Sequence, residues 1–82
     1  MMKRREYLLP LTIGRLEDGQ YLGRSPLLPG LNVQGGSIEE VVRLAPKVAR
    51  SLIAAMREKK VALPAGMTRV KTPLRVQVLV AV

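Results

Sequence analysis

One long amphipathic segment limits the folds open to this chain more than any other feature. From about residue 38 to residue 59, apolar side chains recur with the period of an α-helix. They form a single stripe, and a lone helix must bury such a stripe against another element. The segment therefore predicts one helix packed on a sheet. The apolar positions are Ile38, Val41, Val42, Ala45, Val48, Ala49, Leu52, Ile53 and Met56.

Both ends of this helix have residues typical of helix termini, and its interior contains a proline, which disfavours a helix. Ser37 followed by Glu40 is typical of a capping box, in which each side chain meets a backbone N–H of the first turn. Lys59 and Lys60 place positive charge at the negative end of the helix dipole. Pro46 removes an interior hydrogen bond and crowds the preceding turn. Because the apolar stripe continues in phase across Pro46, we expect one kinked helix rather than two.

Short alternating segments before the helix predict strands. Residues 5–16 place Tyr, Leu, Leu and Ile on one face, and Asp18-Gly19 is a hairpin signal that leads into a returning strand at 20–25. A Pro29-Gly30 turn then precedes a short third strand at 31–34. These three segments supply the sheet that the helix requires.

The end of the sequence predicts one more strand. Residues 61–73 contain two prolines and a glycine and are expected to form a loop. Residues 74–82 alternate regularly, and an exposed strand of this composition promotes aggregation. We therefore expect it to lie inside the sheet or to pair across a subunit interface. The order β-β-β-α-β predicts an α+β fold in which one antiparallel or mixed sheet is covered by one helix, with residues 1–82 as a single domain.

Composition excludes several classes of chemistry. The 82 residues contain no Cys and no His, and two Tyr are the only aromatic residues. Disulfides, thiolate nucleophiles, Cys/His zinc sites and histidine bases are therefore impossible. The carboxylates lie in the expected turn and helix cap rather than clustered on a strand, so a two-metal nuclease site is not expected. We predict a protein that is not an enzyme and that carries no cofactor or metal.

Charge is distributed unevenly along the chain. The net charge is +8, and all of the excess falls in residues 43–82, which hold nine basic residues and one acidic residue. This asymmetry suggests an anionic partner, although a solvated face that keeps a small protein in solution is an equally good reading. No run approaches the length of a membrane-spanning helix, so we expect a cytoplasmic protein without membrane contact. Candidate contact residues on one side of the helix are Arg43, Lys47, Arg50 and Arg57.

Three short motifs follow one another between residues 18 and 40. They are Asp18-Gly19-Gln20-Tyr21, Pro26-Leu27-Leu28-Pro29-Gly30 and Gln34-Gly35-Gly36-Ser37-Ile38-Glu39-Glu40. This succession resembles the HicB-type antitoxin family, in which a hairpin, a Pro-x-Leu-Pro-Gly turn and a Gln-Gly-x-Thr/Ser segment lead into a helix. The structural motif positions are Asp18, Gly19, Pro26, Leu28, Pro29, Gly30, Gly35, Ser37 and Glu40.

The resemblance implies a fold and a function. The fold is a partial RNase H-like domain with the order β-β-β-α-β. The function is to bind and neutralise a small RNA-cleaving toxin of the HicA type in the cytoplasm, as a homodimer or homotetramer. Many family members also carry a C-terminal DNA-binding module, which has no counterpart in these 82 residues, so operator binding is not implied.

A second function stays open beside the antitoxin reading. Lys and Arg side chains suffice for non-specific contacts to phosphates, so the helix face and the C-terminal half of the chain could bind nucleic acid. Tyr7 and Tyr21 are the only side chains able to stack on bases, and both lie in the neutral half. Sequence-specific recognition of single strands is therefore not expected.

Overall fold

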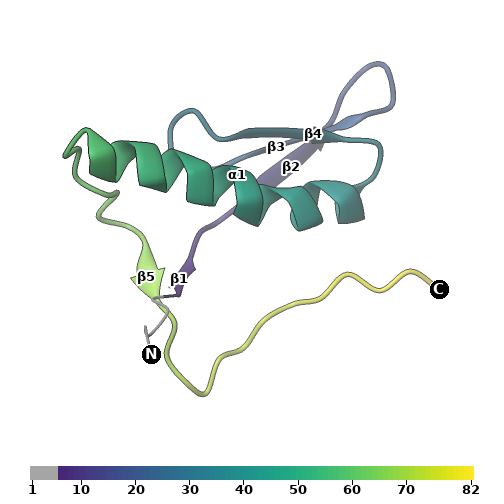
Figure 1. Cartoon of the computed structure of the whole chain (residues 1–82). Helices are drawn as coiled ribbons and strands as arrows, with labels where there is room; N and C mark the ends of the chain where they lie inside the picture. Colours follow the sequence, from purple (N-terminus) through teal and green to yellow (C-terminus); the bar gives the residue numbers. More distant parts are fainter. Residues whose placement is uncertain (1–5) are drawn as a thin grey trace.

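The computed structural model describes residues 6–82 and shows an α+β arrangement (Figure 1). The order of elements confirms the β-β-β-α-β prediction, with the first expected strand divided in two; residue 5, at its start, lies outside the described residues. The elements are β1 (Tyr7–Leu8), β2 (Thr12–Arg15), β3 (Tyr21–Arg24), β4 (Asn32–Gly35), α1 (Ile38–Glu58) and β5 (Thr68–Arg69).

A three-stranded antiparallel sheet has the order β2-β3-β4. The hairpin between β2 and β3 closes where the N–H of Gly19 donates to the carbonyl of Leu16 at 3.0 Å. Gly19 has a φ of +89°, a conformation that favours glycine. The Asp18 carboxylate accepts a hydrogen bond from the Gln20 N–H at 3.0 Å, which fixes the turn from the side chain. The hairpin predicted at Asp18-Gly19 is thus confirmed.

The connection from β3 to β4 contributes to the core. Ser25 is buried, and its hydroxyl accepts a hydrogen bond from the Leu27 N–H at 3.2 Å. Leu28 is only 1% exposed, and its carbonyl accepts from the N–H of Leu31 at 3.2 Å. Gly30, with a φ of +90°, completes the tight turn that Pro29-Gly30 predicted. This turn therefore folds two leucines under the helix rather than projecting into solvent.

Helix α1 packs across β4 and β3, as Figure 1 shows, and the core lies between these layers. Val41 is fully buried at the centre of the contact. A Cβ atom on Gly23 would lie 2.6 Å from Val41 Cγ1, so the absence of a side chain at Gly23 allows the helix to approach the sheet closely. The buried apolar residues are Leu28, Leu31, Val33, Val41 and Ala45.

Helix α1 begins and ends close to where the sequence predicts. The Ser37 hydroxyl accepts a hydrogen bond from the Glu40 N–H at 3.1 Å, which satisfies one donor of the first turn. The helix continues through Pro46 as one element, so the prediction of a single helix is confirmed. At the far end, the Lys59 and Lys60 N–H groups donate to carbonyls of the last turn, at Ala55 and Arg57.

The prediction of a strand at residues 74–82 is wrong for the chain taken alone. These residues form no strand, and all of them are exposed. The last strand is instead β5, which pairs antiparallel with β1 at Tyr7↔Arg69 and Leu8↔Thr68. The expected single sheet is therefore divided into a three-stranded and a two-stranded sheet. The physical reason is that a strand needs a neighbouring backbone for its hydrogen bonds. Alternating side chains suit a segment to a sheet, but no backbone lies beside residues 74–82.

Candidate binding groove

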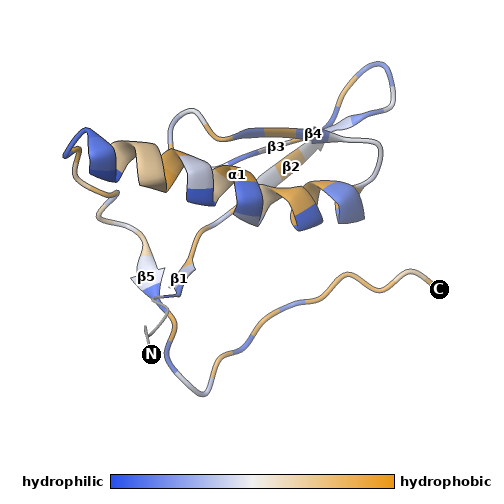
Figure 2. Cartoon of the chain, viewed as in Figure 1, coloured by the Kyte–Doolittle hydropathy of each residue, from blue (hydrophilic) through white to orange (hydrophobic). Residues whose placement is uncertain are grey.

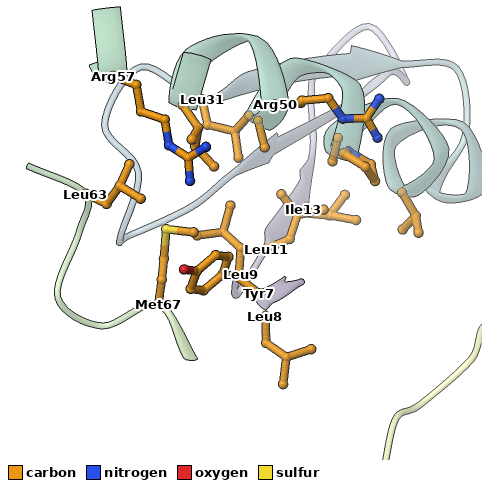
Figure 3. A pocket seen from close by; sticks show the side chains of 15 residues that line it. Tyr7, Leu8, Leu9, Leu11, Ile13, Leu31, Arg50, Arg57, Leu63 and Met67 are labelled. Carbon is orange, nitrogen blue, oxygen red and sulfur yellow. The ribbon is translucent and has the colours of Figure 1, made fainter. Parts of the chain in front are cut away.

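An apolar groove of about 630 Å³ lies between α1 and the segment that runs from β1 into β2 (Figure 3). Apolar side chains from both elements form its walls, and the loop before β5 closes one end. It is lined by Tyr7, Leu8, Leu9, Leu11, Ile13, Leu31, Val42, Ala45, Pro46, Ala49, Arg50, Ile53, Arg57, Leu63 and Met67.

The strand side of the groove follows from the alternation at residues 7–13. Leu9, Leu11 and Ile13 are half-buried and face the helix, while Thr12 between them is exposed. Strand β2 is at the edge of its sheet, and α1 packs mainly on the two strands beyond it. The side chains on this edge are consequently covered less completely than those of β3 and β4.

The helix side of the groove comes from one flank of the apolar stripe. Val42, Ala49 and Ile53 recur at intervals of seven and four residues, and Pro46 lies among them, so all four lie on one side of the helix. Val42 is 50% exposed, whereas Val41 beside it is fully buried. The stripe is therefore wider than the contact that α1 makes with β3 and β4, and its uncovered flank borders the groove.

The structure separates the four basic residues that the sequence grouped on the helix. Arg50 and Arg57 line the groove, and Figure 3 shows both side chains at its helix wall. Arg43 and Lys47 are exposed on α1 but do not line it. The groove thus combines an apolar floor with two guanidinium groups, a combination suited to an apolar segment whose flanks accept hydrogen bonds or carry negative charge.

The motif residues of the sequence analysis lie elsewhere. None of them lines the groove, and they gather along the path from the first hairpin to the start of α1. Gly35 is buried where a Cβ atom would stand 3.2 Å from Cβ and Cγ of Glu40, so strand and helix meet closely there. Leu28 is in the core, whereas Pro26 and Pro29 are exposed.

Sequence reasoning missed the groove itself. The alternation at residues 5–16 predicts a strand and the helix stripe predicts a buried face, but neither pattern shows whether the two apolar surfaces match in width. A signal was present: Val42 and Pro46 extend the stripe to one side of the Val41 and Ala45 positions. Locating the groove also requires knowing that β2 is an edge strand, which depends on how the strands pair.

The described residues offer little else in the way of a site. Within residues 6–82, no group of three or more acidic side chains is placed to hold a metal ion. In the same part of the chain, no helix has the length and apolar character needed to cross a bilayer. Comparison with protein-family models, with curated proteins and with solved structures gives no match.

Proposed function

We propose that this chain is a HicB-like antitoxin, a cytoplasmic protein that binds a small RNA-cleaving toxin of the HicA type and blocks its active surface. The observation that supports this proposal most strongly lies in residues 18–40. The hairpin turn, the Pro29-Gly30 turn and the Ser37 helix cap follow one another there in the same order as the motifs of that family. The α+β order of elements agrees with this assignment.

Neutralisation by such a protein needs coverage rather than chemistry. A bound protein that excludes RNA from the toxin abolishes cleavage without any reactive group of its own. This chain offers the sheet face opposite α1 for that purpose. The sheet face presents Leu22 among polar side chains, since Gly23 and Val33 point toward the helix.

Capture of a partner tests this proposal. The tagged full-length chain is passed over its own cell extract after nuclease treatment, at low and at high salt, and retained proteins are identified by mass spectrometry. We expect one small protein to remain bound at high salt and to be encoded beside this chain. An unrelated small protein of similar positive charge serves as the control, since it reveals capture by charge alone. Capture of ribosomal or other RNA-associated proteins only, lost after nuclease treatment, contradicts the antitoxin role.

Non-specific binding of nucleic acid is the second candidate function. The observation in its favour is that Arg43, Lys47, Arg50 and Arg57 are all exposed along α1. Each is free to contact a phosphate group, and such contacts release counterions from the nucleic acid. No base-reading element is required for binding of this kind.

Charge reversal on the helix tests the second function. Arg43→Glu, Lys47→Glu and Arg50→Glu together are expected to abolish binding to a labelled RNA or DNA duplex, measured by fluorescence anisotropy. Each change alone is expected to lower the slope of log affinity against log salt by about one. Arg24→Glu is the matched control, because Arg24 lies on the sheet and not on α1. Equal losses for the control and the helix variants would show that α1 is not the contact surface.

A further inference from the structure

We propose that residues 74–82 of one copy of this chain occupy the groove of a second copy, and that the exchange is reciprocal. The bound segment adds a strand beside the outer edge of β2, under the free flank of α1. The inference concerns this chain alone and does not depend on the toxin proposed above. Three features of the structure carry it: the exposed segment, the groove, and the path of the chain between them.

The exposed segment has the pattern of a strand that lacks its sheet. Val76, Val78 and Val80 are 64%, 77% and 68% exposed, and they lie on one side of an extended chain together with Leu74 and Val82. Figure 2 shows this C-terminal stretch as largely apolar, although it runs through solvent. A continuous row of branched apolar side chains is not stable in water without a partner surface.

The groove has the matching pattern. The outer backbone edge of β2 is unpaired within the three-stranded sheet, and Leu11 and Ile13 beside it face the helix. A strand placed there bonds to β2 and turns one face toward Val42 and Ala49. The alternation then directs Leu74, Val76 and Val78 into the groove.

Charge is consistent with this placement. Arg75 and Gln77 alternate with the valines, so they lie on the opposite side of the segment and face away from the groove. Arg50 and Arg57 at the groove wall therefore do not meet Arg75 directly. The two guanidinium groups remain available to backbone carbonyls of the incoming segment.

The segment does not lie in the groove of its own chain. Val70 is held where its N–H donates to the Glu6 carbonyl at 2.9 Å, beside the β1–β5 pair. From there, residues 74–82 run clear of the molecule (Figure 1). Every copy carries both a groove and an exposed segment. In a two-fold symmetric dimer, the segment of each copy can therefore bind in the groove of the other.

Paired variants test each half of the contact by analytical ultracentrifugation. The full-length wild-type chain is expected to sediment as a dimer, with twice its mass of 9.0 kDa. Val78→Asp on the segment and Val42→Asp in the groove are each expected to give monomers. Both side chains are exposed in the single copy, so neither change disturbs its core; unchanged circular dichroism verifies this, and Val80→Asp repeats the segment test.

Matched controls separate a specific contact from a general effect of charge. Gln77→Asp adds the same charge to the opposite side of the segment, and Ser51→Asp adds it to α1 away from the groove. Both controls are expected to remain dimeric. A dimer that survives Val78→Asp, or a wild-type chain that is monomeric throughout the concentration range, would overturn the proposal.

Mixing the two defective variants distinguishes exchange between copies from folding back within one. Val42→Asp retains an intact segment, and Val78→Asp retains an intact groove. We expect the mixture to form a one-to-one heterodimer, although each variant alone is monomeric. A mixture that stays monomeric, while the wild-type chain dimerises, shows that the groove of one copy does not accept the segment of another.

Discussion

Gly23 determines how closely the helix approaches the sheet. A Cβ atom there would lie 2.6 Å from Val41 Cγ1 and 3.3 Å from Leu11 Cδ1, distances at which neighbours must move. Val41 is fully buried and cannot shift without disturbing the core. We expect Gly23→Ala to lower the free energy of unfolding by about 1–3 kcal/mol, measured by urea denaturation.

Gly14 is the control for this prediction. It lies in β2, in the same sheet, but an added Cβ atom meets nothing within 4 Å. Gly14→Ala is expected to leave the free energy of unfolding unchanged or to raise it by up to about 1 kcal/mol, because alanine restricts the unfolded chain. Equal destabilisation by both substitutions would mean that close contact with Val41 is not the reason for glycine at position 23.

Ser37 stabilises the start of α1 through a single hydrogen bond. Its hydroxyl accepts from the Glu40 N–H at 3.1 Å. Ser37→Ala leaves that donor without its partner, so we expect a loss of about 1 kcal/mol in the free energy of unfolding. Ser37→Asp keeps an acceptor and is expected to restore most of the loss. Thermal unfolding followed by circular dichroism measures both, and a Ser37→Asp variant no more stable than Ser37→Ala would argue against capping.

At the scale of elements, the internal proline of α1 lowers the stability of the helix. Pro46 has no N–H, so the carbonyl of Val42 lacks its usual partner in the helix. Pro46→Ala supplies that donor and is expected to raise the free energy of unfolding by up to about 3 kcal/mol, measured by urea denaturation. Lys47→Ala, next to it and exposed, is expected to change stability by about 0.5 kcal/mol or less. A Pro46→Ala variant less stable than the wild type would mean that the proline ring makes an essential contact in the groove.

Elements defined by local interactions were predictable from the sequence. The hairpin at Gly19 and the helix from Ile38 each depend on residues within a few positions, and both are present. Alternation alone predicts a strand at residues 74–82, but these residues form none in a single copy. The groove was not predictable either, because its walls come from Leu11 and Val42, which are distant in sequence, and its width depends on how α1 crosses the sheet.

For the molecule as a whole, the excess of positive charge after residue 42 distinguishes the two proposed functions. Arg43 and Lys47 are exposed outside the groove, where salt screens them readily. Binding through these charges is expected to weaken steeply between low and physiological salt, as for other phosphate contacts. Binding of a protein through apolar surface is expected to persist at high salt. Partner affinity measured across a salt series therefore tells which kind of surface is in use.

Inhibition of RNA cleavage tests the antitoxin proposal most directly. The captured small protein is purified, its cleavage of a labelled RNA is measured, and the full-length chain is added in increasing amounts. We predict that cleavage falls to zero at a ratio of chain to toxin that stays the same when the RNA concentration is changed, and that the inhibition persists at high salt. Cleavage that continues with the chain in excess, or an amount of chain needed for inhibition that rises with the RNA and not with the toxin, would contradict the account, since the chain would then bind the substrate and not the toxin.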